Sequence, residues 1–380
     1  MDFAYTENME MYKKIARDFC DRHVAPTAGE YDKSREFPYE VLEKMGKEGF
    51  MGINVPKEYG GLGLDYLTNA VIVEELARAS ATIALIHQVH RVCVNHLITF
   101  GSDEQKQRFL PGLATGQHLG GFCFTENQTA SDPMDFTCFA ERKNDHYVVN
   151  GAKGWVTNSV AGTVFVVFMR IAKENGRNSF NNFLVEKDFP GFSVGPRYRT
   201  VGFCASTTCD FKFKDMKVPM ENRLGEEGGG LAHIGRTIHW GQAYLGVIGV
   251  GIGEACLEQA AKYAKQRVIS GNPIIKYQLI AQKLADMFIE IESARMLCHK
   301  AVWMIENGIN PVLHSRAAKV AAGEACMKAA VEALEIMGSA GYSDEYPVER
   351  YFRDAKFIAV GLGPAEIQRI NMGRAIEKIY

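Results

Sequence analysis

The hydrophobic pattern of the chain changes twice, and this order limits the folds that are available. Residues 1–118 carry apolar side chains at helical spacing, including a largely apolar run at 81–100 that is too long for a strand. Residues 119–223 form short runs rich in β-branched and aromatic residues, separated by polar turns. Residues 224–380 return to the helical period. We therefore expect an α+β protein with an N-terminal helical domain, a central antiparallel β domain and a C-terminal four-helix bundle.

Composition excludes several classes of function. Of the 380 residues, 47% are hydrophobic and 23% are charged, which suits a large folded core and not a disordered chain. The formal net charge is -2 and no basic block is interleaved with aromatic residues, so we expect no nucleic-acid partner. The first residues lack a charged-then-apolar leader, and no apolar run reaches the ~20 residues of a membrane span. We expect a cytoplasmic protein that does not enter a membrane.

Three local patterns are explained by structure alone and do not indicate a functional site. The nine cysteines include no C-x-x-C pair and no cluster with histidines, which predicts free, mostly buried thiols without a disulfide framework or metal site. Asn150-Gly151 after a strand-like run predicts a turn. The glycines of 246–253 resemble a dinucleotide fingerprint, but no strand precedes them and Glu254 replaces the last glycine. We interpret them as small residues that let helices approach closely.

Three groups of segments carry a more specific pattern. They are 122–132 (FCFTENQTASD) with 150–158 (NGAKGWVTN), 263–273 (YAKQRVISGNP) with Gln278, and 337–342 (MGSAGY) with 353–369 (RDAKFIAVGLGPAEIQR). In this order they resemble the motifs of the acyl-CoA dehydrogenase family, and the resemblance covers nearly the whole chain. It implies an FAD-dependent oxidoreductase that acts on the CH-CH bond of an acyl-CoA thioester and passes hydride to flavin N5. It also implies electron transfer to an electron-transfer flavoprotein and a homotetramer, a dimer of dimers.

The same resemblance implies the residues that hold FAD. They are Phe122, Phe124, Thr125, Ser131, Trp155, Thr157, Arg267, Gln278, Gly338, Ser339 and Glu366. Trp155 offers flat cover and Thr157 a donor to the flavin edge. The planar fork of Arg267 suits a pyrophosphate, and Arg267 and Gln278 are implied to reach FAD bound mainly by a neighbouring subunit. Small residues at Gly338 and Ser339 leave backbone N–H groups accessible.

The resemblance implies a thioester ligand beside Ser131, Tyr244, Leu362 and Gly363, and here the family pattern breaks. Leu362 occupies the place of the family's catalytic glutamate, and leucine cannot take a proton. Some members carry this glutamate on the first long C-terminal helix, but an ungapped alignment from Tyr263 places Gly241 and Gln242 there. A general base contributes roughly 10²–10⁴-fold to rate. Either the base has moved, or the reaction does not begin at the α carbon.

A polar stretch within the apolar helix at 86–96 offers replacement groups. We hypothesise that His87, His90 or Arg91 faces the acyl pocket, with an imidazole as displaced base or the guanidinium holding a negative substrate group. They could instead point to solvent or pair within a subunit interface. His239 is a further candidate.

The sequence therefore predicts an FAD-dependent acyl-CoA dehydrogenase for an unusual thioester, one that is cyclic or already unsaturated. Two alternatives stay open. The first is redox-neutral elimination or desulfination of an acyl-CoA on the same flavoprotein scaffold. The second is a non-catalytic acyl-CoA-binding protein.

Overall fold

The N-terminal part of the chain is helical, as predicted. The computed structural model describes residues 4–129, 133–172 and 178–379. The α-helices of this part are α1 (Glu7–Phe19), α2 (Ala25–Ser34), α3 (Tyr39–Lys47), α4 (Tyr66–Ala79), α5 (Ala81–Phe100) and α6 (Asp103–Ala114), and a π-helical segment (Cys20–Val24) joins α1 to α2. The predicted run 81–100 coincides with α5, which begins where the Ser80 side chain accepts a hydrogen bond from the Ile83 N–H.

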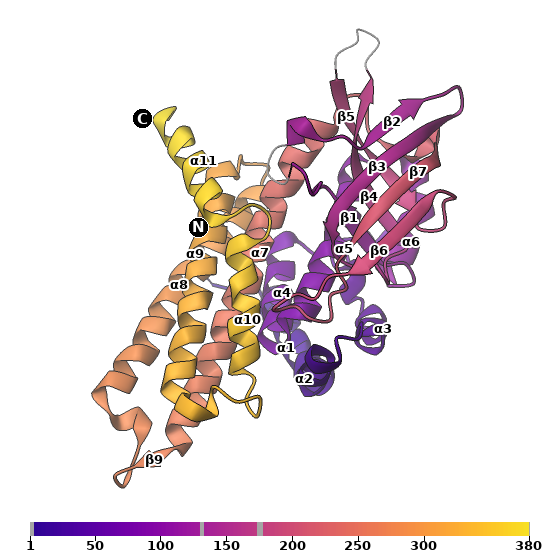
Figure 1. Cartoon of the computed structure of the whole chain (residues 1–380). Helices are drawn as coiled ribbons and strands as arrows, with labels where there is room; N and C mark the ends of the chain where they lie inside the picture. Colours follow the sequence, from indigo (N-terminus) through magenta and orange to yellow (C-terminus); the bar gives the residue numbers. More distant parts are fainter. Residues whose placement is uncertain (1–3, 130–132, 173–177, 380) are drawn as a thin grey trace.

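The central part forms one mixed sheet, which Figure 1 shows beside the helices. Its strands are β1 (Gly120–Cys123), β2 (Phe139–Arg142), β3 (His146–Val156), β4 (Val164–Ala172), β5 (Asn178–Glu186), β6 (Phe192–Arg197), β7 (Cys209–Pro219) and β8 (Arg223–Leu224). Their order is β6-β7-β3-β2-β4-β5-β8, and β1 pairs with β4. Most pairs are antiparallel, as predicted, but β4 pairs in parallel with β1 and with β2.

The predicted turn at Asn150-Gly151 is wrong, because β3 continues through it to Val156. Val149 pairs with Met216 and Gly151 with Phe213, so one residue of β3 opposes two residues of β7. Asp215 takes the left-handed conformation there, and its N–H donates to Asn150 Oδ1 at 2.9 Å. The Asn-Gly pair therefore belongs to a β-bulge and not to a hairpin turn.

The C-terminal part is the predicted helical bundle. It consists of α7 (Gly230–Gln266), α8 (Gln278–Glu306), α9 (Val312–Met337), α10 (Val348–Val360) and α11 (Ala365–Glu377). A short hairpin, β9 (Val268–Ile269) and β10 (Asn272–Pro273), joins α7 to α8. Figure 1 shows this hairpin at the end of the bundle that is remote from the sheet.

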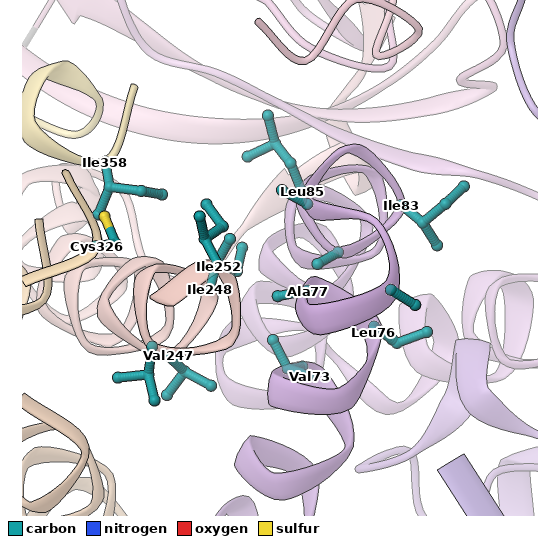
Figure 2. Close-up of a cluster of buried hydrophobic side chains, with 14 of the residues drawn as sticks. Val73, Leu76, Ala77, Ile83, Leu85, Val247, Ile248, Ile252, Cys326 and Ile358 are labelled. Carbon is teal, nitrogen blue, oxygen red and sulfur yellow. The ribbon is translucent and has the colours of Figure 1, made fainter. Parts of the chain in front are cut away.

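One apolar core connects the two helical parts. Figure 2 shows Val73 and Ala77 of α4 beside Ile248 and Ile252 of α7, all of which are buried. Glycines make this approach possible, since a Cβ on Gly251 would lie 2.5 Å from a backbone oxygen of α4. The glycines of 246–253 therefore serve helix packing within α7, as the sequence indicates.

Two further predictions have a direct outcome. All nine cysteines lie in the described part of the chain, and all are buried and unpaired, which confirms their interpretation as free thiols. Within residues 4–129, 133–172 and 178–379, no helix combines the length and apolarity that crossing a membrane requires. The predicted domain boundary after residue 118 falls between α6 and β1, and the one after residue 223 falls inside β8.

Candidate active site

The loop between α10 and α11 carries Leu362 in a strained conformation. Leu362 has φ 50°, in the left-handed region, and its side chain is 42% exposed. Across from it lies Gly241 of α7, where an added Cβ would stand 3.0 Å from Leu362 Cδ1. The two positions at which the family resemblance expects a glutamate therefore face each other, although 121 residues separate them in the chain. Neither position carries an acid.

Two amide side chains hold this loop against α7. Gln242 Nε2 donates to Gln368 Oε1 at 3.0 Å and to the Leu362 carbonyl at 3.4 Å. Gln368 Nε2 also donates to the Leu362 carbonyl, at 3.3 Å. Both amides are buried, so they are ordered donors to the backbone and not proton acceptors.

Lys319 of α9 holds the same loop through two backbone carbonyls. Its Nζ donates to the carbonyls of Ala359 and Gly363, each at 2.7 Å. The side chain is fully buried, and this burial lowers the pKa of Lys319 to about 8. The sequence did not reveal this residue. An isolated lysine in an Ala-rich helix gives no indication that it will contact a loop 40 residues further along the chain.

His90 of α5 has no ring nitrogen to spare. Its Nδ1 accepts the Gly120 N–H at 2.9 Å, and its Nε2 donates to the Met51 carbonyl at 3.1 Å. The ring is fully buried, and burial lowers the pKa of His90 to about 4. His90 thus joins α5 to β1 as a neutral imidazole. A catalytic role for His90 stays a prediction that this geometry disfavours.

His87 differs from His90 in one respect. Its Nε2 donates to the Phe50 carbonyl at 2.8 Å, while its Nδ1 has no partner among the described residues. Burial lowers the pKa of His87 well below the usual value. His87 therefore retains a lone pair, although it holds a proton weakly.

His239 is half-buried, and its Nδ1 lies 3.4 Å from Gln242 Oε1, next to the Leu362 loop.

Arg91 is buried among aromatic rings. Its side chain is only 1% exposed, and its guanidinium lies 4.9 Å from the Trp240 ring centroid and 4.8 Å from that of Tyr244. Its Nη2 donates to Asn54 Oδ1. The Tyr244 hydroxyl donates to the Tyr66 carbonyl at 2.6 Å. Since His87, His90 and Arg91 are all buried, the alternative that they point to solvent is wrong.

Trp155 presents a flat surface at the end of β3. Its ring is 55% exposed and stacks on Tyr198 at a centroid distance of 4.2 Å, with 5° between the planes. Its φ is 56°, and its N–H donates to Asp210 Oδ1 at 3.2 Å. Phe122 and Phe124, at the end of β1, lie with their rings nearly parallel. Exposed aromatic surface of this kind fits a planar ring system such as a flavin.

A buried ion pair shapes this aromatic surface. Lys153 Nζ lies 2.8 Å from Glu126 Oε1 and donates to the Phe124 carbonyl at 3.1 Å. The Thr125 carbonyl accepts the Gly154 N–H at 2.8 Å. The pair therefore ties the end of β1 to β3. Glu126 and Lys153 both lie within the family motifs, but the sequence gives no sign that they form an ion pair.

The remaining predicted positions fall into two places. Thr157 is half-buried after β3, and Glu366 is exposed in the first turn of α11, close to the Leu362 loop. Ser131 lies outside the described residues. By contrast, Arg267, Gln278, Gly338 and Ser339 lie at the far end of the bundle, and all four are exposed.

The distance between these two places is large. Gly241 lies within α7, and Arg267 directly follows the end of this helix, 26 residues later. At about 1.5 Å of rise per residue, the two positions are about 39 Å apart. Figure 1 shows β9, next to Arg267, far from the sheet. The ring of Tyr346, in the segment between Ser339 and α10, lies 5.8 Å from Tyr263 near this end of α7. The two groups of residues therefore lie far apart within a single chain.

Comparison with known proteins gives a consistent result over the whole chain. The family models for the N-terminal, middle and C-terminal domains of acyl-CoA dehydrogenase match residues 6–117, 121–216 and 228–377. An acyl-CoA dehydrogenase of Bacillus subtilis (strain 168) is 40% identical over 370 residues, which is 97% of this chain and 98% of the relative.

Solved structures agree with the family models. Butyryl-CoA dehydrogenase from Megasphaera elsdenii is 36% identical with a TM-score of 0.95, and the match covers 99% of this chain and 100% of that chain. An acyl-CoA dehydrogenase from Bacillus anthracis complexed with FAD is 32% identical with a TM-score of 0.92, and the match covers 99% of this chain and 68% of that chain.

Proposed function

The chain belongs to the acyl-CoA dehydrogenase family, and from this premise we propose that it is a dehydrogenase for an acyl-CoA whose reaction does not use the family's usual glutamate. As a member of this family it is an FAD-dependent oxidoreductase that acts on the CH-CH bond of an acyl-CoA. The observation that carries the proposal is the pair of facing positions, Leu362 and Gly241, which offer no carboxylate. We propose a cyclic or already unsaturated thioester as substrate.

The chain's own residues fit the cofactor. Trp155 exposes its ring in a left-handed backbone conformation that an L-residue adopts only at a cost, and a bound ring system would compensate by covering this surface. Trp155, Thr157, Phe122 and Phe124 would hold the isoalloxazine, as the motifs suggest. Bound FAD supplies the acceptor for the hydride that leaves the acyl chain.

The groups around Leu362 constrain the proton transfer. Gln242 and Gln368 donate to the Leu362 carbonyl and cannot act as bases. Of the imidazoles that the sequence singles out, two remain available to take a proton: His87, through its unpartnered Nδ1, and His239, which lies beside Gln242. In our proposal one of these groups, and not His90, accepts the proton. Lys319 and the two amides would keep the loop in place while the acyl chain binds.

We propose a cofactor site that is shared between copies of the chain, and therefore an oligomer. Because about 39 Å separates Gly241 from Arg267 along α7, we propose that Arg267 and Gln278 of one copy complete the FAD site of another. Exposed apolar side chains on α8, such as Leu279 and Ile289, offer surface for such an assembly. We propose a homotetramer, a dimer of dimers, with electron-transfer flavoprotein as the electron acceptor.

One observation favours a second candidate function. Arg91 is a buried cation close to the acyl site, and it suits a reaction that expels or retains an anionic group. Redox-neutral elimination or desulfination of an acyl-CoA is therefore the alternative.

Anaerobic stopped-flow absorbance with the purified yellow protein tests these proposals. Cyclic, unsaturated and straight-chain thioesters are mixed with it in turn, and products are identified by mass spectrometry. Bleaching of the flavin by a cyclic or unsaturated thioester, faster than by a straight-chain one, is the result that we expect. A new product without bleaching would establish the redox-neutral reaction, and tight binding with neither would indicate a binding protein. A colourless protein that takes up no FAD would overturn the whole proposal.

A further inference from the structure

The carboxylate of Asp210, on β7, accepts hydrogen bonds from three segments that meet beside Trp155. The Trp155 N–H donates to its Oδ1 at 3.2 Å. The Asn127 side-chain amide and the Tyr198 hydroxyl both donate to its Oδ2, at 2.9 Å and 2.8 Å. Asp210 therefore ties the end of β3 to the segment that follows β1 and to the residue that follows β6. Hydrogen bonds to a carboxylate are stronger than those between neutral groups, so these contacts fix the three segments relative to one another.

Tyr198 occupies one face of the Trp155 ring. The two ring centroids lie 4.2 Å apart, with 5° between the planes. Tyr198 is held there by its hydroxyl bond to Asp210 and by its N–H, which donates to the Thr208 carbonyl at 2.9 Å. The hydrogen bond to Asp210 raises the pKa of Tyr198, so its hydroxyl remains a donor at neutral pH. Trp155 is nevertheless 55% exposed, and a planar ligand can therefore stack only on the opposite face of the indole.

The same contacts fix the backbone of Trp155. Its φ of 56° lies in the left-handed region, which an L-residue keeps only where the surrounding structure imposes it. The Asp210 carboxylate binds the Trp155 N–H directly. The preceding Gly154 N–H donates to the Thr125 carbonyl at 2.8 Å, and a Cβ on Gly154 would collide with Asn127 Oδ1. The direction of the indole is therefore set by its neighbours before any ligand binds.

We propose that Tyr198 and Asp210 are positioning residues for the flavin: Tyr198 blocks one face of the Trp155 indole, and Asp210 holds both residues so that the opposite face receives the cofactor. This inference rests on the proposed function, because it assumes that Trp155 covers the isoalloxazine. Neither positioning side chain needs to touch FAD. Their contribution to FAD binding passes through Trp155, because a ring that is already in place loses less conformational entropy when the cofactor binds.

A double-mutant cycle on the FAD-bound protein tests the proposal. The Kd for FAD is obtained from the fluorescence that released FAD gains when the yellow protein is diluted. We expect Tyr198→Ala to weaken FAD binding about five-fold, the size expected for the loss of one aromatic stack. Asp210→Ala removes three hydrogen bonds and should weaken FAD binding at least as much. In a Trp155→Ala background each of these changes should alter the Kd less than about two-fold, because their effect depends on the indole.

A second readout is the visible circular dichroism of the bound flavin, which depends on the groups packed against its ring. Tyr198→Ala and Asp210→Ala should both change this spectrum. Tyr198→Phe keeps the stacked ring, so it should retain the spectrum and a Kd within about two-fold of the wild type. Asp215→Asn is the matched control, because Asp215 lies on the same strand and accepts the Asn150 amide at 3.1 Å, but does not contact Trp155. It should leave both readouts unchanged. Tyr198→Ala carries the test if Asp210→Ala does not fold.

Three outcomes would overturn the proposal. The first is a wild-type Kd and spectrum in Tyr198→Ala, whatever its Tm, because this would assign the stack to the sheet alone. The second is an equal loss of FAD affinity with and without Trp155, because the residues would then act independently of the indole. The third is a loss in Tyr198→Phe as large as that in Tyr198→Ala. If Trp155→Ala alone weakens FAD binding, the proposed role of Trp155 stands and only this inference fails; if Trp155→Ala leaves the Kd unchanged, the proposed flavin site fails as well.

Discussion

Replacing Leu362 by glutamate should introduce the base that, in our proposal, this active site lacks. The structure favours the substitution, because the Leu362 side chain is 42% exposed and the introduced carboxylate need not leave water completely. Leu362 already has φ 50°, so glutamate would bear the same backbone cost and folding stability should hardly change. The Gln242 and Gln368 amides hold the Leu362 carbonyl, which should keep the new side chain directed toward Gly241.

The expected gain follows from the contribution of a general base. Such a group accelerates a reaction roughly 10²–10⁴-fold. At about 1.36 kcal/mol per ten-fold, this corresponds to about 3 to 5 kcal/mol of activation free energy. Because the surrounding side chains are not adapted to a carboxylate here, we expect the lower limit, about 100-fold. The introduced carboxylate should be ionised at neutral pH, since an exposed glutamate has a pKa of about 4.3.

The assay is the rate of anaerobic flavin reduction by a straight-chain saturated thioester such as butyryl-CoA, in a single turnover. Leu362→Gln is the matched control, because it has nearly the same shape but cannot take a proton, and its rate should equal that of the wild type. If Leu362→Glu binds FAD and has the same Tm as the wild type but reduces its flavin no faster, then Leu362 does not face the α carbon and our reading of the loop is wrong.

Three further predictions concern other parts of the structure. Gly241→Glu should give a smaller gain in the flavin-reduction rate, about ten-fold, because its Cβ would stand 3.0 Å from Leu362 Cδ1. The double variant Gly241→Glu with Leu362→Gly removes this close contact and should be faster than Gly241→Glu alone in the same assay. Wild-type rates in the single and the double variant would contradict the facing geometry. Asp354 is buried, which raises its pKa to about 7, so the stability that protonation contributes is complete below about pH 3.8 and is lost as the pH rises to 7. The side chain of Asp354→Asn still accepts the Phe203 N–H and should flatten the dependence of folding stability on pH, with a gain of up to about 4 kcal/mol in unfolding free energy above pH 7. An unchanged pH dependence of Tm in this variant would refute the assignment. Trp155→Ala removes an exposed ring and should change the Tm of the FAD-free protein by no more than about 2 °C. It should weaken FAD binding at least ten-fold, measured by fluorescence titration. Unchanged affinity for FAD would show that Trp155 does not cover the cofactor.

Part of the candidate site was accessible from sequence, because motifs are local. The segments around Trp155 and Thr125 were recognised from residue order alone, and the structure gives this region an exposed flat surface. That Arg267 serves a neighbouring subunit stays a prediction; the structure places it about 39 Å from Gly241 along α7. The functions of the polar residues of α5 were not accessible, since His90 depends on Gly120 and Met51, which come from other segments.

The sequence by itself determined the secondary structure and the order of the three parts, because helical and strand periodicity depend only on neighbouring residues. It predicted α5 to the residue and the nature of the middle sheet. Tertiary structure decided the rest: the bulge at Asn150, the facing of Leu362 and Gly241, and the burial of Arg91 between two aromatic rings. Each of these depends on which distant segments meet when the core closes, and contacts between distant segments leave no periodic trace in a single sequence.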